Sequence, residues 1–230
     1  MIDLSRPVMA QEQMDAPDLP PETYAAVLHD LSRVNKWTMA ARPTLGFLGR
    51  IARPGEPLRI LDVGYGAGDM LRTIAQWGRT RRIPLTLVGI DLNPRSAAVA
   101  KAATAQDMEI DYRTGDYADL ANQNWDVILS SLVAHHMSRE ELIQFLRFMD
   151  GEASRGWLIN DLHRHRFAYL GYPLLARLMQ WHPIVRQDGT LSIARSYRRD
   201  EWRPLLDEAA IMGARVFRAF PFRLCVERCR

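Results

Sequence analysis

The 230-residue chain has only two cysteines, and it contains no long apolar run. Cys225 and Cys229 lie four residues apart, which in a β-strand is ~13 Å on one face, too far for a disulfide bond. No second cysteine cluster accompanies them, so the sequence predicts no metal site of the zinc-finger kind. No apolar stretch approaches the roughly 20 residues of a membrane-spanning helix.

Lysine is also scarce, because Lys36 and Lys101 are the only lysines among 30 basic residues. The net charge is +3, and the arginine clusters at 79–82 and 198–199 lack interleaved aromatic residues. We therefore expect no nucleic-acid partner. Residues 1–21 are polar and contain no apolar core of a signal peptide, which predicts a cytoplasmic protein.

An apolar run over 58–63 stops at a segment with three glycines, Gly64-Tyr65-Gly66-Ala67-Gly68, and an amphipathic run over 70–77 follows. This pattern predicts a strand, a tight turn and a helix. Glycine permits a positive φ and lets a ligand approach the backbone, and the start of a helix presents free N–H groups. The turn is thus either a cradle for a polar ligand or a purely structural connection.

The glycine spacing is G-x-G-x-G, whereas the dinucleotide fingerprint is G-x-G-x-x-G and needs glycine where Asp69 stands. With Asp62 at the strand end, the segment resembles the cofactor loop of class I S-adenosylmethionine-dependent methyltransferases. The resemblance implies a doubly wound α/β fold with a seven-stranded, mostly parallel, Rossmann-like sheet. It also implies that the loop binds the amino-acid end of S-adenosylmethionine through Asp62, Gly64, Tyr65, Gly66 and Gly68.

Three further predicted strands, over 85–90, 109–113 and 125–131, each end in polar residues. The resemblance implies that Asp91, after the first of these, binds the ribose hydroxyls; a helix-capping role is the alternative. It implies that Asp116 meets the adenine amine and that Tyr117 or Leu92 covers the ring. It also implies that the fourth strand of the sheet brings Ser130 and Ser131 near the methyl group.

Histidines follow the fourth predicted strand and a fifth, expected over 156–160, and ligands sit at such strand ends in open α/β sheets. A phenolic hydroxyl has a pKa near 10, so a base helps its methylation at neutral pH, and histidine suits that task. The candidates are His136, His135 and His163, in that order. Each histidine could instead be structural, for example by capping the helix expected over 139–149.

The resemblance implies that the N-terminal helices and an inserted segment cover the acceptor; the alternative is that the N-terminal helices only pad the core. Residues 1–54 form an arm and two helices, the second over 45–51 after a break at Pro43, and 55–230 form the methyltransferase domain. An insertion at 163–197, with an aromatic helix over 167–181 and a polar loop over 185–195, is expected to form a lid. A helix over 199–212 and two strands over 215–220 and 222–229 close the fold. The expected acceptor-binding residues are Trp37, Asn160, Asp161, Tyr169 and Tyr172.

The function implied is transfer of a methyl group from S-adenosylmethionine to a small aromatic acceptor, with oxygen favoured and carbon or nitrogen open. Segments 13–17, 31–35 and 160–164 resemble methyltransferases of polyketide or quinone pathways. The helix over 167–181 could instead pad the core, or pack on a second subunit in a homodimer. A catalytically silent cofactor-binding subunit remains an alternative. A nicotinamide-dependent reductase is disfavoured by the glycine spacing and by the 28 residues from Gly64 to Leu92.

Overall fold

The computed structural model describes residues 3–230 and contains a seven-stranded sheet with the order β3-β2-β1-β4-β5-β7-β6. The five strands β1 to β5 are parallel, and β7 pairs antiparallel with both β5 and β6. This arrangement confirms the predicted sheet and its closing hairpin. The strands are β1 (Leu58–Val63), β2 (Leu85–Asp91), β3 (Ile110–Thr114), β4 (Trp125–Ser131), β5 (Ala153–Leu162), β6 (Arg215–Ala219) and β7 (Arg223–Cys229).

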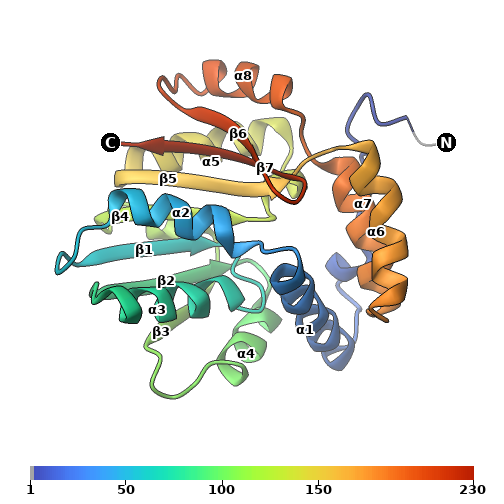
Figure 1. Ribbon diagram of the computed structural model, residues 1–230, viewed down its shortest axis with the longest axis horizontal. Helices are drawn as coiled ribbons and strands as arrows, with labels where there is room; N and C mark the ends of the chain where they lie inside the picture. The colour runs from blue at the N-terminus through green and yellow to red at the C-terminus, as the bar shows by residue number, and fades with distance from the viewer. Residues whose placement is uncertain (1–2) are drawn as a thin grey trace.

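Helices cover both faces of the sheet and its carboxyl edge (Figure 1). The α-helices are α1 (Pro21–Trp37), α2 (Ala41–Ile51), α3 (Asp69–Arg81), α4 (Pro94–Ala102), α5 (Arg139–Glu152), α6 (Arg166–Leu178), α7 (Pro183–Arg195) and α8 (Arg199–Glu208). Three short 3-10 helices are η1 (Gln13–Asp15), η2 (Tyr117–Leu120) and η3 (Ala134–His136). No helix within residues 3–230 has both the length and the apolar character needed to cross a membrane.

Side chains of the apolar run in β1 pack in two separate hydrophobic cores. Ile60 packs in a cluster with residues of α2 and α3, whereas Leu61 and Val63 pack in a cluster with residues of α5 and α8. Successive strand side chains point to opposite faces, so a strand covered on both sides must be apolar at nearly every position. This requirement explains why β1 reads as a continuous apolar run.

A third group of helices, α1, α6 and α7, lies beyond the carboxyl ends of the parallel strands (Figure 1). These helices share a small core of their own, in which Val27 of α1 packs with Trp181 and Val185. They stand opposite the turns that follow β1, β2 and β4. The chain therefore encloses a space at the edge of the sheet where α/β proteins bind ligands.

The prediction of a polar loop over 185–195 is wrong, because these residues lie within α7. Val185 and Ile193 are buried, which a solvent-exposed loop would not achieve. Gly189, which favoured a turn, instead makes room for the ring of Tyr172: a Cβ there would lie 2.3 Å from its Cζ atom. Gly189 is therefore needed for side-chain packing, and α7 is continuous across it.

Three predicted helix boundaries also differ from the structure. The helix expected over 167–181 ends at Leu178, so that Trp181 lies outside it. The helix expected over 45–51 begins at Ala41, with Pro43 in its first turn, where a missing backbone N–H breaks no helical hydrogen bond. The helix expected to reach Met212 ends at Glu208. Cys225 and Cys229 are free thiols, as their spacing predicted.

Candidate functional site

A cavity of about 720 Å³ lies between the carboxyl edge of the sheet and the group formed by η1, α1, α6 and α7. Its volume falls within the roughly 300–1,000 Å³ range of small-molecule sites. Most of its lining is apolar, with polar groups at two places. One is the glycine turn after β1, and the other is the segment after β4 that carries the paired histidines.

The glycine turn takes backbone conformations that other residues adopt only with strain. Gly64, Gly66 and Gly68 have φ angles of 76°, 51° and 72°. A Cβ on Gly64 would lie 2.3 Å from Val133 Cγ2, and one on Gly68 would lie 2.5 Å from the Tyr112 hydroxyl. Gly64 and Gly66 line the cavity together with the buried Tyr65, whereas Gly68 is not part of the lining.

Three carboxylates, those of Asp62, Asp69 and Asp91, face the cavity beside this turn. Asp62, at the end of β1, is only 1% exposed, and its Oδ1 has no hydrogen-bond partner among the described residues. Burial raises the pKa of Asp62 well above its ordinary value. Asp91, at the end of β2, accepts hydrogen bonds from the backbone N–H groups of Gly66 and Asn93, both at 2.9 Å. Burial also raises the pKa of Asp91.

Of the three residues predicted to contact the adenine, two line the cavity and one does not. Leu92 and Tyr117 line the cavity, and the Tyr117 ring rests on two phenylalanines. Asp116 is exposed and lies outside the lining; its Oδ1 accepts a hydrogen bond from the N–H of Ala118 and so caps η2. The local turn thus accounts for Asp116 without a ligand.

The two serines at the end of β4 also differ in position. Ser131 lines the cavity, and its hydroxyl donates a 3.4 Å hydrogen bond to the carbonyl of Asn160. Ser130 is buried outside the lining, and its Oγ has no partner among the described residues. Only one of the pair therefore contributes surface to the cavity.

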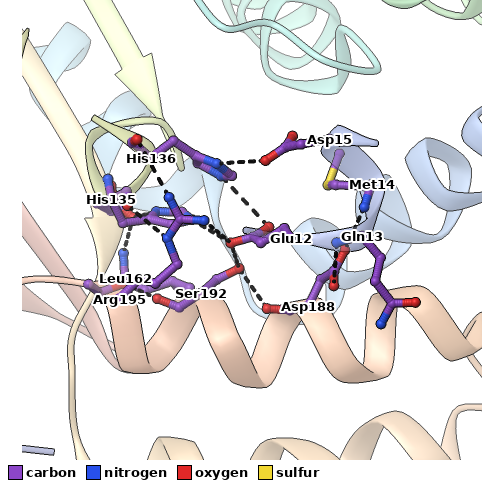
Figure 2. A network of polar contacts seen from close by, with 12 residues as sticks. Glu12, Gln13, Met14, Asp15, His135, His136, Leu162, Asp188, Ser192 and Arg195 are labelled. Atoms are coloured by element: carbon purple, nitrogen blue, oxygen red, sulfur yellow. Dashed lines mark hydrogen bonds and ion pairs between the residues drawn. The ribbon is translucent and has the colours of Figure 1, made fainter. Parts of the chain in front are cut away.

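His135, in η3, is buried between two carboxylates. Its Nδ1 lies 2.7 Å from Asp161 Oδ1. Its Nε2 lies 3.6 Å from Glu12 Oε1, and Figure 2 shows His135 and Glu12 side by side. Burial alone would lower the pKa of His135, but Asp161 and Glu12 outweigh it and raise the pKa to about 9. At neutral pH this imidazole holds a proton, which makes it a poor proton acceptor.

His136 reaches the same carboxylate from the cavity side. Its Nε2 lies 3.8 Å from Glu12 Oε2, and its Nδ1 lies 3.3 Å from Asp15 Oδ2 (Figure 2). The side chain is 29% exposed and lines the cavity. A histidine oriented by a carboxylate and open to a ligand has the arrangement of a general base.

Glu12 is one of two site residues that the sequence did not predict, because it lies in the arm expected to be extended. It is 4% exposed, and its Oε1 accepts a 2.8 Å hydrogen bond from Ser192 of α7. Asp188, one turn earlier on α7, accepts hydrogen bonds from the backbone N–H groups of Gln13 and Met14. The arm is therefore tied to α7, and these contacts hold Glu12 against the histidines.

Several residues predicted to bind the acceptor or act as base lie elsewhere. His163 is buried outside the cavity, and burial together with Arg218 lowers its pKa to about 4. Asn160 donates hydrogen bonds to Ala40 and Thr44, so it ties β5 to the start of α2.

Of the four remaining residues predicted to bind the acceptor, one lines the cavity and three do not. Trp37 is 62% exposed, and Tyr169 faces a separate surface hollow between α6 and α7. Asp161 is buried outside the lining, where it holds His135. Tyr172 does line the cavity, and its hydroxyl donates a 2.8 Å hydrogen bond to the carbonyl of Val185.

A buried cation that the sequence reading missed completes the lining. Arg223, the first residue of β7, is 2% exposed and faces the cavity. Its Nε and Nη1 have no hydrogen-bond partner within residues 3–230, and burial lowers its pKa. A buried guanidinium with free donors is suited to bind a carboxylate.

Comparisons with known proteins agree with this architecture. Residues 60–150 match the family model described as a methyltransferase domain. Over 96 residues the chain is 36% identical to a ubiquinone biosynthesis O-methyltransferase of Mesorhizobium japonicum, a match covering 40% of this chain and 36% of that protein. A relative with the same description from Brucella ovis is 36% identical over 93 residues, covering 39% and 35%. The match thus spans little more than a third of these relatives.

Solved structures extend the similarity to the whole fold. Human N-acetylserotonin methyltransferase in complex with S-adenosylmethionine aligns with a TM-score of 0.63 and 13% identity, covering 92% of this chain and 56% of that one. Magnesium protoporphyrin IX methyltransferase from Synechocystis, with bound S-adenosylhomocysteine, aligns with a TM-score of 0.57 and 17% identity, covering 94% and 90%. At such identities the likeness shows the fold alone. Residues 60–150 thus match a methyltransferase domain, and the chain as a whole has the fold of solved S-adenosylmethionine-dependent methyltransferases.

Proposed function

We propose that the protein transfers a methyl group from S-adenosylmethionine to a small acceptor, most favourably an aromatic hydroxyl. The observation that carries this proposal is the single cavity that joins the glycine turn at Gly64 to the paired histidines at His136. One place suits the cofactor and the other suits an oxygen that must lose its proton. The O-methyltransferase relatives support oxygen as the acceptor atom.

The residues at the glycine turn fit the cofactor. The free Oδ1 of Asp62 would pair with the amine of its amino-acid end, and the free donors of Arg223 with the carboxylate. Each oxygen of Asp91 already accepts one backbone hydrogen bond and retains a lone pair for a ribose hydroxyl. Tyr117 and Leu92 would cover the adenine. Bound there, the cofactor supplies a methyl group on a sulfonium leaving centre.

The acceptor oxygen would bind beside His136. Of the three candidate bases, His135 holds its proton at neutral pH, and His163 lies outside the cavity. His136 is open to the cavity and is oriented by Asp15. Tyr172 and the apolar side chains of Phe167 and Leu175 would pack on the acceptor ring.

Residues 163–197 and the N-terminal segment would act together as the lid. They form the wall of the cavity opposite the sheet, and the bonds from Gln13 and Met14 to Asp188 join them. Excluding water strengthens the electrostatic interactions between the charged groups inside. We therefore assign 1–54 and 163–197 to acceptor enclosure, and the rest of 55–230 to cofactor binding and the sheet.

The test is methyl transfer to a panel of phenols and hydroxyquinones, with mass spectrometry of the products, for the wild type and His136→Ala. Removing a general base typically costs ~10²–10⁴-fold in rate, and we expect a loss in this range with unchanged S-adenosylhomocysteine affinity. A loss below about tenfold would exclude His136 as the base. Cofactor binding without any product from oxygen, nitrogen or carbon acceptors would instead support a silent binding subunit.

A further inference from the structure

The two neighbouring histidines converge on one carboxylate. His135 Nε2 lies 3.6 Å from Glu12 Oε1, and His136 Nε2 lies 3.8 Å from Glu12 Oε2. The three residues offer ligand atoms that all lie within 4.8 Å of one another. Tetrahedral coordination with bonds of 2.0–2.1 Å separates ligand atoms by roughly 3.4 Å. Small side-chain shifts would therefore bring all three onto one ion.

Each of these side chains is also oriented by a partner behind it. Asp161 accepts from Nδ1 of His135 at 2.7 Å, and Asp15 faces Nδ1 of His136 at 3.3 Å. Ser192 donates to Glu12 at 2.8 Å. Metal-binding histidines almost always have a carboxylate or carbonyl at the second ring nitrogen, which turns the first toward the ion.

His135 supplies the independent sign of a missing ligand. It is 5% exposed, and its Nε2 has no hydrogen-bond partner among the described residues, because Glu12 lies just beyond hydrogen-bond reach. Buried polar atoms are rarely left without a partner, and such an atom needs an explanation. A cation between Nε2 and the Glu12 carboxylate would satisfy both.

The charge of the cluster suits a divalent cation. The carboxylates of Glu12, Asp15 and Asp161 surround the histidines, and Arg195 approaches Glu12 Oε1 at 3.8 Å. A metal would displace the proton of His135, and with both imidazoles neutral the three carboxylates and one guanidinium leave two negative charges. The carbonyl oxygen of Asp188 accepts a hydrogen bond from Ser192. The carboxylate of Asp188 accepts hydrogen bonds from the backbone of η1, so we do not count it as part of the cluster.

We propose that Glu12, His135 and His136 form a binding site for a divalent transition metal of the zinc class, open toward the cavity. Two imidazoles and one carboxylate with a free position are the ligand set of a catalytic rather than a structural zinc site. Imidazole nitrogen selects zinc and its transition-metal neighbours over magnesium and calcium, which prefer oxygen ligands.

The site opens toward the cavity, so a bound metal could activate the acceptor hydroxyl. This role of the metal rests on the proposed function. An acceptor hydroxyl at the open position would coordinate the cation, which lowers the pKa of the bound oxygen. Its proton would leave to solvent, and the oxygen would then form the new O–CH₃ bond while the S–CH₃ bond of the cofactor breaks. His136 serves as a ligand in this state and as the base only when the cation is absent.

The experiment uses the purified full chain, treated with chelator and then titrated with Co²⁺ followed by absorption and with Zn²⁺ followed by calorimetry. We expect one site per chain and the visible bands of cobalt in a low-symmetry site. Glu12→Gln and His136→Ala should weaken Zn²⁺ binding at least tenfold, and Asp161→Asn by about 10–100-fold. His29→Ala removes an exposed histidine that is not part of the cavity lining, and it should leave Zn²⁺ binding unchanged.

Melting curves of each variant show whether it is folded, and S-adenosylhomocysteine titrations report on the cofactor site independently. Absence of Zn²⁺ binding by the folded wild type would overturn the proposal and leave the proposed function standing. Equal affinities of the wild type, Glu12→Gln and His136→Ala would do the same, because the metal would then bind elsewhere. A metal-binding protein without cofactor affinity would instead refute the proposed function alone.

Discussion

Arg223 is a buried guanidinium whose Nε and Nη1 lack partners within residues 3–230. Asp161 and Asp69 lie near it, but without an anion in direct contact such a charge costs free energy, and its removal can stabilise a protein. We expect Arg223→Met to raise the unfolding free energy of the ligand-free protein by roughly 1 kcal/mol or more. The same change should weaken S-adenosylhomocysteine binding at least tenfold, because the cofactor carboxylate loses its partner.

Thermal melts and calorimetry measure these two opposite effects. Arg199→Met, which removes an exposed arginine at the start of α8, is the matched control and should alter neither quantity appreciably. Lower stability with unchanged cofactor affinity in Arg223→Met would show that Arg223 is structural.

His163 makes stability depend on pH. Burial and nearby arginines lower its pKa to about 4 in the folded protein, against about 6.5 when unfolded. Above pH 6.5 both states are neutral at this residue, but between pH 6.5 and 4 only the unfolded state takes up the proton. Stability is therefore lost as the pH falls through this window, by about 1–2 kcal/mol at pH 5.

The pH dependence is checked by thermal melts at pH 7 and pH 5 for the wild type and His163→Gln. The variant should lose less stability than the wild type over this step, and His29→Gln should behave like the wild type. Equal losses in all three proteins would contradict a buried neutral imidazole at position 163.

At the scale of single residues, the sequence predicts best where chemistry is local. The glycines and Asp91 belong to one strand-turn-helix unit and its neighbour, so their spacing already implies a shared site. Glu12 could not be found in this way, because its partner Ser192 is 180 residues away. Arg223 was missed for the same reason, since only the fold of β7 brings it to the cavity.

The turn between β1 and α3 is the element whose geometry is most restrictive. Gly64 and Gly55 both have positive φ angles, of 76° and 81°, but only Gly64 would press a Cβ against Val133. Gly55→Ala therefore reports the backbone strain alone, about 1 kcal/mol, and Gly64→Ala adds the steric conflict.

We expect Gly64→Ala to lose more stability than Gly55→Ala and to lose most of its S-adenosylhomocysteine affinity, because Val133 and the turn must move. Urea unfolding and calorimetry on both variants measure this difference. Similar behaviour of the two variants would mean that the turn tolerates a side chain and is not the cofactor cradle.

Helix α7 shows where element prediction fails. Gln187-Asp188-Gly189 has the composition of a turn, and periodicity alone does not reveal the helix. Each residue type is explained by a distant contact instead: Asp188 binds the backbone of η1, and Gly189 accommodates Tyr172. Tertiary contacts therefore outweigh local propensity in this element.

At the scale of the whole molecule, the sheet was predictable because β1, β2, β4 and β5 are buried on both faces and read as short apolar runs. The assembly of η1, α1, α6 and α7 over the carboxyl edge was not, since several packings would bury the same apolar residues. A homodimer stays a prediction. The exposed leucines on α6, Leu170, Leu174 and Leu178, are the surface on which we expect it.

The central claim is that the glycine turn and Asp91 hold S-adenosylmethionine. Calorimetric titration with S-adenosylhomocysteine, on the wild type, Asp91→Ala and the exposed control Asp111→Ala, tests it most directly. We predict micromolar binding by the wild type and the control, and binding weaker by tenfold or more in Asp91→Ala. No binding by the folded wild type, or equal affinity in all three proteins, would contradict the account.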